Sequence, residues 1–287
     1  MMVTCIGKAN LDISYSIQQV HLGNNHVSLS VDLHLGGKAA NVSVALKKLG
    51  IQSQLIADIG GDPFGQKITE ELKTFGVISL LKVKPAMTGF TFIVVEQDGT
   101  NTMFNYIGAN ALLSLEDISR YESELVESDL VFYQASAGRQ KEIIEYLKKL
   151  QCPIFIELSE PVEPELLNGI ESISLNEEEA LRVTRTENTF DALGRLLSFG
   201  VGSIFLKLGD KGAIYANREN IIYGKPYKIS PVDTTGAGDA FTAGCIYGIL
   251  NNMPVERILD FANKCGAITC IRRGTTEAFP TYKEVEN

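Results

Sequence analysis

Runs of apolar, β-branched and aromatic residues alternate with amphipathic helical stretches along most of the chain. The strand-like runs lie at residues 2–7, 53–59, 129–135, 153–158, 171–175 and 203–208. The helical patterns lie at residues 36–50, 62–75, 139–151, 177–184, 189–199, 237–251 and 254–271. Strands that are joined through helices pair in parallel, because parallel neighbours need a long crossover connection. The alternation therefore predicts an α/β fold with a mostly parallel sheet and helices on both of its faces.

Two stretches depart from this alternation. Residues 27–35 alternate without a break, so that five apolar residues from Val27 to Leu35 share one face of a strand. A second stretch spans residues 88–107, where Asp98-Gly99 is a strong hairpin signal. Together they predict a small half-buried sheet with one apolar face, separate from the main core. No linker or internal repeat interrupts the chain, and we predict a single domain over residues 1–287.

Charge and cysteine content limit the partners and the setting. The 287 residues carry a formal net charge of −9, whereas nucleic acids and anionic membranes are bound by basic surfaces. We therefore expect neither as a partner, and no apolar run approaches the ~18 residues of a membrane span. The five cysteines form no C-x-x-C pair, and the N-terminus has no secretory pattern. These features predict buried, reduced thiols in a cytoplasmic protein.

Residues 232–241 read VDTTGAGDAF and form the most informative local motif. Glycine allows close approach to the backbone, and the first amides of the helix that follows lack partners within that helix. Those amides and the helix dipole suit a phosphate, with Asp239 beside it in the first helical turn. A carboxylate is a weak base, but phosphoryl transfer asks mainly for positioning and late proton removal. Taken alone, the motif fits equally well a glycine-rich turn followed by an acid that the dipole favours.

Four familiar alternatives are not supported by the sequence. A P-loop would need glycine five residues before Gly37, where Asp32 stands, and a dinucleotide fingerprint would need a third glycine in place of Phe241. All three histidines lie between residues 21 and 34, far along the chain from the Gly-Ala-Gly turn. A Ser-His-Asp hydrolase or a histidine metal site at that turn is therefore disfavoured.

A cluster of polar residues lies near the N-terminus. Asn10 and Asp12 follow the first strand, at the carboxyl end where open α/β sheets place their ligands. Gly36-Gly37 leads into a helix that carries Lys38 and Asn41 near its start. Acid, ammonium and amide groups together can pair with several hydroxyls of a polyol. The alternative is helix capping, which would explain Asn41 by itself more readily than the whole cluster.

Two further motifs are weak by themselves. In SLNEEEA (174–180), Asn176 and Glu179 could orient a hydrated Mg²⁺ and phosphates, because Mg²⁺ keeps its waters and needs few protein oxygens. An acidic first helical turn is common for dipole reasons, and this interpretation is the favoured one. LKLGDKGAIY (206–215) predicts a hairpin. Such a hairpin could line a nucleotide site, but the motif alone does not indicate one.

Taken in order, these motifs closely resemble the PfkB/ribokinase family of ATP-dependent carbohydrate kinases, in its ribokinase-like subgroup. The resemblance covers nearly the whole chain. Its matching segments are GKANLD (7–12), GGKAANVSVALKKLG (36–50), TG (88–89), GAN (108–110), NEEE (176–179), LGDKG (208–212), DTTGAGD (233–239) and AITCIRRG (267–274). It implies a Rossmann-like three-layer sandwich with a mostly parallel central sheet. It also implies a small β lid, formed here by about residues 13–35 and 86–107.

The resemblance also implies roles for individual residues, several of which act through their backbone. Asp239 matches the catalytic base, and the amides of Gly236, Ala237 and Gly238 match the anion hole. The sugar-binding positions are Asn10, Asp12, Gly37, Lys38, Asn41 and Gln134. The nucleotide positions are Asn176, Lys207, Gly209, Gly212 and Asn263, and Glu179 is the acid associated indirectly with Mg²⁺. The positions for a monovalent cation such as K⁺ are Asp233, Thr235, Thr269, Arg272, Gly274 and Ala278.

Two departures and the lid composition bear on the acceptor. Ser136 stands where ribokinases place a ribose-binding glutamate, and the front motif reads GGKAAN instead of GGKGAN. Neither predicted lid segment contains Lys or Arg, whereas a phosphorylated sugar would call for basic side chains. We therefore expect transfer of the γ-phosphate of Mg-ATP to a hydroxymethyl group of a neutral, ribose- or fructose-like sugar. A nucleoside kinase and a non-catalytic sugar sensor are the alternatives, and the apolar lid face makes a homodimer plausible.

Overall fold

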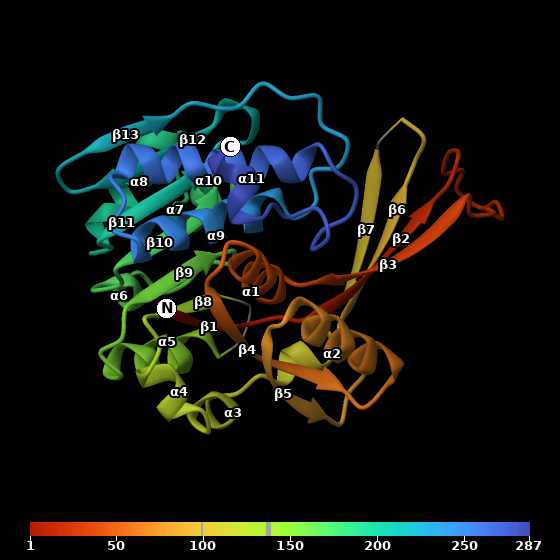
Figure 1. Cartoon of the computed structure of the whole chain (residues 1–287), viewed down its shortest axis with the longest axis horizontal. Coiled ribbons are helices and arrows are strands. Elements are labelled where there is room, and N and C mark those ends of the chain that lie inside the picture. The colour runs from red at the N-terminus through yellow and green to blue at the C-terminus, as the bar shows by residue number, and fades with distance from the viewer. Residues whose placement is uncertain (99, 136–138) are drawn as a thin grey trace.

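The structure of the protein, a computed structural model, describes residues 1–98, 100–135 and 139–287. Within them, nine strands form a main sheet in the order β13-β12-β11-β10-β9-β8-β1-β4-β5 (Figure 1). Their bounds are β1 Met2–Ile6, β4 Gln52–Gly60, β5 Ile78–Lys84, β8 Leu130–Ala135, β9 Ile154–Leu158, β10 Ser172–Asn176, β11 Ser203–Lys207, β12 Ala213–Asn217 and β13 Ile221–Gly224. The seven strands from β5 to β11 pair in parallel, and β12 and β13 add an antiparallel edge. The predicted fold class is confirmed.

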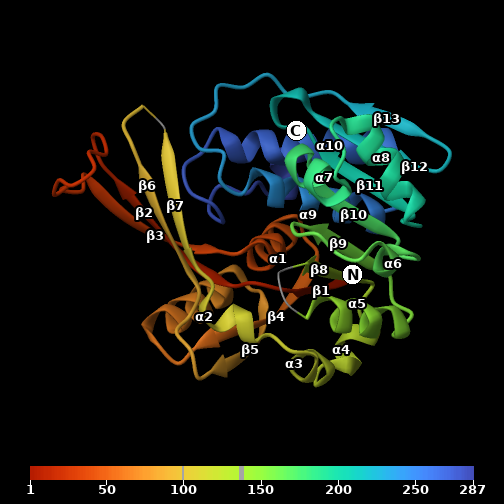
Figure 2. The same ribbon diagram turned by 180° about the vertical axis from the view of Figure 1, so that it is seen from behind.

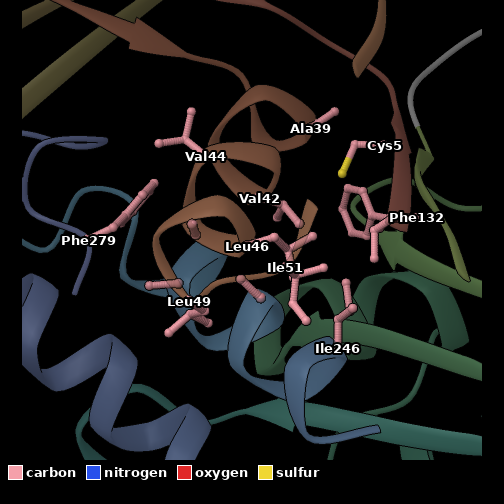
Figure 3. Packing of buried hydrophobic residues seen from close by; sticks show 14 of the residues in the cluster. Cys5, Ala39, Val42, Val44, Leu46, Leu49, Ile51, Phe132, Ile246 and Phe279 are labelled. Carbon is pink, nitrogen blue, oxygen red and sulfur yellow. The ribbon is translucent and has the colours of Figure 1, made fainter. Parts of the chain in front are cut away.

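Helices cover both faces of this sheet. One face is covered by α1 (Lys38–Lys48), α2 (Pro63–Phe75), α9 (Ala237–Leu250), α10 (Val255–Cys270) and the short α11 (Tyr282–Glu286). The other is covered by α3 (Leu115–Ser119), α4 (Glu122–Val126), α5 (Gln140–Lys149), α6 (Pro164–Leu167), α7 (Glu177–Thr184) and α8 (Thr189–Ser198). Successive strand residues divide between the two cores, because side chains alternate along a strand. Cys5 and Phe132 face the first core, where Figure 3 shows them with Leu46, and Ile6 and Tyr133 face the second.

The sequence pattern missed the short and peripheral elements. The edge strands β5 and β13 and the helices α3, α4, α6 and α11 were not predicted. Apart from the seven-residue β5, these elements have five residues or fewer and are too short to show a full hydrophobic period. The hairpin predicted from LGDKG is present, since β11 and β12 pair antiparallel across this turn.

A second sheet of four strands projects from the body (Figure 2). This lid sheet contains β2 (Asn10–Ser16), β3 (Ser30–Gly36), β6 (Phe90–Val95) and β7 (Asn101–Tyr106), in the order β3-β2-β6-β7. The expected partners β6 and β7 pair antiparallel, although Gly99 of the predicted turn lies outside the described residues. Strand β2 was not predicted as a strand, and Asn10 and Asp12 were expected only to follow the first strand. They instead begin a central strand of the lid sheet.

The two faces of the lid sheet differ in chemistry. Strand register aligns His34, Asp12, Thr91 and Asn105 in one row across the four strands. The neighbouring row, on the opposite face, is Leu33, Ile13, Phe92 and Phe104.

The prediction that this apolar face is half-buried was wrong for most of β3 and the residues before it. Val27 is 88% exposed, and Leu33 and Phe104, which share one row of this face, are 44% and 59% exposed. Leu35 at the base of the sheet is fully buried. Alternation identifies which residues share a face, but it does not show whether another part of the chain covers that face.

Candidate active site

Parallel strands bring several polar side chains to one edge of the main sheet. Glu157, Asn176 and Lys207 lie at or near the carboxyl ends of β9, β10 and β11, which are neighbours in the sheet. The N-terminus of α1 lies at the same edge, because Lys38 donates a hydrogen bond to Glu157. The N-terminus of α9 lies beside it, because Asp239 accepts a hydrogen bond from Asn41. Ligands of open α/β sheets bind at this edge.

Glycines 36 and 37 let the lid sheet and α1 meet closely. A Cβ atom on Gly36 would lie within 2.4 Å of the Asp12 carboxylate, and one on Gly37 would lie 2.5 Å from the Lys8 carbonyl oxygen. Gly37 also has a φ of 89°, a backbone angle that residues other than glycine rarely adopt. The GGK sequence therefore allows Asp12, Lys38 and Asn41 to converge.

Asp12 is the lid residue best placed to bind an acceptor. It is largely buried, and its Oδ1 atom has no hydrogen-bond partner among the described residues. Burial raises the pKa of Asp12 to about 6, against the opposing effects of the Thr91 hydroxyl and of His34. An unpaired buried acceptor is costly, so this oxygen is suited to a hydroxyl group of a ligand.

Asp239 is 8% exposed in the first turn of α9, and its Oδ2 accepts a hydrogen bond of 2.7 Å from Asn41 Nδ2. The Oδ1 atom of Asn41 is itself buried without a partner in the described chain. Burial raises the pKa of Asp239 to about 6, even though Lys38 and the Asn41 hydrogen bond act in the opposite direction. A carboxylate with this pKa accepts a proton near neutral pH more readily than an ordinary aspartate does.

The Gly-Ala-Gly turn presents backbone amides beside Asp239. Gly236 adopts a φ of 76° at the start of α9, and a Cβ atom there would lie 2.8 Å from the Thr275 side chain. The Ala237 amide donates to the Thr234 carbonyl at 3.2 Å. The amides of Gly236 and Gly238 have no acceptor within the described chain. Gly238 is open, since its nearest neighbour would be the Lys207 side chain at 3.7 Å. Two free amides at a helix N-terminus suit a phosphate group.

A cavity of about 610 Å³ opens beside this turn. Of the predicted nucleotide residues, Lys207, Gly209, Gly212 and Asn263 line it, together with Ala237 and Gly238. Asn176 does not, and Asn263 Nδ2 donates to the Lys225 carbonyl at 3.0 Å. The sequence did not point to Tyr227, Ile229, Phe241 or Cys270 in the lining. The volume lies within the usual range for cofactor sites.

Asn176 and Glu179 form a capping box at the start of α7. The Asn176 Oδ1 accepts from the Glu179 amide at 2.7 Å, and Glu179 Oε2 accepts from the Asn176 amide at 2.8 Å. The remaining oxygen of Glu179 accepts from Lys38 Nζ at 2.9 Å. The described residues contain no group of three His, Cys, Asp or Glu side chains that could enclose a metal. These side chains fit Mg²⁺ only as outer contacts of an ion held by phosphates and water.

Lys38 and Lys207 meet at a buried carboxylate that the sequence did not reveal. Glu157 Oε1 accepts from Lys207 Nζ and, at 3.3 Å, from Lys38 Nζ. Lys38 also donates to Ser159 Oγ at 2.8 Å and to Glu179. We call Lys38, Glu157, Glu179 and Lys207 the site cluster. An acid inside the apolar run PIFIEL was the one available signal, because a buried charge is rarely left without a partner.

Two predicted sugar-binding residues contact the protein itself. Asn10 Oδ1 accepts from Asn110 Nδ2 at 2.7 Å. Gln134 Oε1 accepts from the amides of Lys8 and Ala39, and so joins β8 to the chain around Gly37. Ser136 lies outside the described residues.

The predicted monovalent-cation positions also have internal partners. The carboxylate of Asp233 accepts from the amides of Thr235 and Gly274, at 2.9 and 3.2 Å. The guanidinium of Arg272 donates to the Ala278 carbonyl at 3.3 Å, and the Arg272 amide donates to the carbonyl of the buried Thr269 at 3.1 Å. The Lys48 ammonium donates to the two carbonyls that flank Ala278, those of residues 277 and 279. These contacts use oxygen atoms at and beside the expected ion site.

Comparisons with known proteins agree along the whole chain. The profile of the pfkB family carbohydrate kinases matches residues 1–282. The ribokinase of Staphylococcus aureus is 27% identical, with 99% of this chain and 98% of that protein covered. The structure of Arabidopsis thaliana ribokinase complexed with ribose and ATP superimposes with a TM-score of 0.85 at 26% identity, covering 99% and 97% of the two chains. That of Thermotoga maritima ribokinase gives 0.89 at 25% identity, covering 99% and 98%.

Proposed function

Because this chain belongs to the pfkB family of carbohydrate kinases and is an ATP-dependent kinase, we propose that it phosphorylates a hydroxymethyl group of a neutral sugar. The observation that carries the proposal is the hydrogen bond between Asn41 and Asp239 beside two free amides of the Gly-Ala-Gly turn. It brings a candidate base, an acceptor-binding amide and an anion site to one point.

The acceptor is held between the lid sheet and α1. Asp12 Oδ1 and Asn41 Oδ1 are buried without partners in the described chain, and each would accept a hydrogen bond from a sugar hydroxyl. Asp239 takes the proton of the attacking hydroxyl late in the transfer, and Asn41 keeps its carboxylate oriented. The neutral carboxylic acid that forms is favoured by the same burial that raises the pKa of Asp239.

ATP occupies the cavity beside α9 in this proposal. Lys207 and the amides of Gly236 and Gly238 bind the phosphate that is transferred, and residues 209–212 and Asn263 lie along the nucleotide. Mg²⁺ carried with the triphosphate neutralises its charge, and Glu179 contributes only outer contacts. A monovalent cation near Asp233 is an activator and not a requirement, because Lys48 and Arg272 already bind carbonyls of the loop beside it.

The lid favours a sugar over a nucleoside. The row of His34, Asp12, Thr91 and Asn105 is polar, as hydroxyl groups require. The aromatic residues Phe92 and Phe104 lie on the opposite face and so do not share a face with Asp12. The related Arabidopsis enzyme is complexed with ribose, and we propose a ribose- or fructose-like acceptor for this chain.

The exposed apolar face of the lid sheet supports pairing of two copies. Val31, Leu33 and Phe104 each expose more than two fifths of their surface on this face. We propose a homodimer through it. A cytoplasmic setting is supported by the five free cysteines, four of them buried. No described helix is long and apolar enough to cross a membrane.

Release of ADP with a panel of acceptors tests the proposed function. Ribose, fructose, other hexoses and nucleosides are compared with ATP and Mg²⁺, with and without K⁺. We expect a free sugar to give the highest kcat/KM. A higher kcat/KM with a nucleoside would show that the protein is a nucleoside kinase. If no compound gives acceptor-dependent ADP release, the result would support the non-catalytic sensor.

A further inference from the structure

One buried acid contacts both lysines of the phosphoryl-transfer site. Glu157 is 1% exposed at the carboxyl end of β9, in the middle of the main sheet. Its Oε1 accepts from Lys207 and Lys38, and its Oε2 accepts from Thr242 Oγ1 at 2.9 Å. Thr242 stands three residues after Asp239, on the next turn of α9. Glu157 thus joins β9, β11, α1 and the helix that carries the candidate base.

The ionised form of Glu157 is maintained by these contacts. Burial alone would raise the pKa of Glu157, but the ammonium groups of Lys207 and Lys38 outweigh burial and lower it. A fully buried carboxylate persists in proteins when its charge is paired and its lone pairs are hydrogen-bonded. Glu157 meets both conditions, with two cations and one hydroxyl group.

The two lysines reach different sides of the transfer site. Lys207 lines the nucleotide cavity, and its Nζ lies 3.8 Å from the position of a Cβ atom on Gly238. Lys38 stands at the start of α1, three residues before Asn41, which binds Asp239. Lys38 has Glu179 and Ser159 as additional partners, whereas Glu157 is the carboxylate that pairs with Lys207 in the described chain. Loss of Glu157 would therefore release Lys207 more than Lys38.

On the basis of the proposed function, we propose that Glu157 is a positioning residue for phosphoryl transfer. Its single carboxylate holds Lys38 on the acceptor side and Lys207 on the nucleotide side, and its bond to Thr242 fixes the helix that carries Asp239. The residue touches neither substrate. It acts through the groups that do.

Glu157 also influences the protonation of Asp239. The negative charge of Glu157 raises the pKa of Asp239, whereas Lys38 and Lys207 lower it. When a neutral residue replaces Glu157, its negative charge no longer offsets the effect of the two ammonium groups on Asp239. The pKa of Asp239 then falls, and the acid limb of the kcat profile moves to lower pH. Loosened packing alone would not shift the acid limb of the kcat profile to lower pH, because it does not change the charges around Asp239.

The test compares Glu157→Gln with Glu157→Asp, Thr242→Val and Glu178→Gln. Glu178 is an exposed acid next to Glu179 of the site cluster, and its substitution controls for a general change of charge. We expect E157Q to lower kcat about 10²-fold, because small displacements of positioned groups cost this much. The KM of the acceptor should change far less, since Asp12 and Asn41 are intact. E157D should recover part of kcat and keep the wild-type acid limb, because it retains the charge. T242V should lower kcat without moving the limb.

Three outcomes would overturn the proposal. The first is wild-type kcat and an unmoved acid limb in E157Q. The second is a loss in E157Q that excess Mg²⁺ restores, because Glu157 would then be a metal contact. The third is an Asp239 titration midpoint that does not fall in E157Q relative to wild type and E178Q, measured by NMR with selective ¹³C labelling of aspartate carboxyl groups. This NMR measurement needs no turnover, so it separates failure of the Glu157 role from failure of the proposed function. Should E157Q not fold, E157D and T242V still test the positioning role, because both should lower kcat with an unmoved acid limb. Wild-type kcat in both variants would then overturn the proposal.

Discussion

Two ion clusters in the described part of the chain each centre on a buried carboxylate, with similar chemistry and different surroundings. In the site cluster, Glu157 binds Lys38 and Lys207. At the β5 edge of the main sheet, Asp117 of α3 binds Lys82 and Lys84 of β5, and Lys84 Nζ also lies 3.2 Å from Asp58 Oδ2 of β4. We call the second group the β5 cluster. In each, a nearly inaccessible carboxylate links two lysines that come from other elements.

The difference lies in what each cluster adjoins. The site cluster includes Lys207 of the nucleotide cavity, and its charges act on Asp239. Asp117 of the β5 cluster instead shares a capping box with Ser114 and so fixes the start of α3. Buried ion pairs are therefore not in themselves signs of an active site, because the same arrangement also joins secondary-structure elements.

The largest expected effect is that of Asp239→Asn. The amide keeps the shape of the side chain but cannot accept the proton, so kcat should fall about 10³-fold, within the usual range for a general base. Binding of a non-hydrolysable ATP analogue, measured by calorimetry, should remain close to wild type. Near-normal turnover would show that another group accepts the proton.

Substitution of one lysine from each cluster separates their roles. Lys207→Met should lower kcat/KM for ATP about 10²-fold, the usual effect of removing one group that stabilises transferred charge. Lys84→Met should leave kcat/KM for ATP unchanged while lowering the midpoint of thermal unfolding. Steady-state kinetics and a melting curve of both variants measure the two quantities. Equal kinetic losses would remove the distinction between the clusters.

Asp117→Asn should affect stability and spare catalysis. Removing one partner of a buried ion pair leaves lysines uncompensated, and we expect the free energy of unfolding to fall by about 3 kcal/mol. Urea unfolding measures this change, with kcat as the control. A tenfold loss of kcat in the folded variant would contradict a purely structural role for the cluster.

The same variant has a defined pH dependence. Burial alone would raise the pKa of Asp117, but hydrogen bonds from Lys82, Lys84 and Ser114 together lower it. The ionised Asp117 therefore stabilises the fold fully above the ordinary aspartate pKa of about 4, and this stabilisation is lost as the pH falls below that value. The difference in stability between wild type and Asp117→Asn should therefore narrow on acidification.

The sequence predicted the framework of both clusters better than the clusters themselves. The alternation of strands and helices established the parallel sheet, and the glycines at 36, 37 and 236 stand where the chain packs too closely for a side chain. Glu157 pairs with Lys207, fifty residues later, and with Lys38, more than a hundred residues earlier. No local pattern encodes such pairs. The exposed lid face was missed for a related reason, since exposure depends on elements distant in sequence.

The smallest expected effect concerns the monovalent cation. Lys48 and Arg272 bind the carbonyls of residues 277–279, and Phe279 packs against Gly236 of the anion turn. The loop is thus held beside the active site by charges of the chain itself. Replacing K⁺ by tetramethylammonium at constant ionic strength should lower kcat only modestly, whereas Lys48→Met should make kcat depend more strongly on K⁺. An inactive wild-type enzyme without K⁺ would show that these two side chains cannot replace the ion, and that the internal contacts of Asp233 and Ala278 rearrange to admit it.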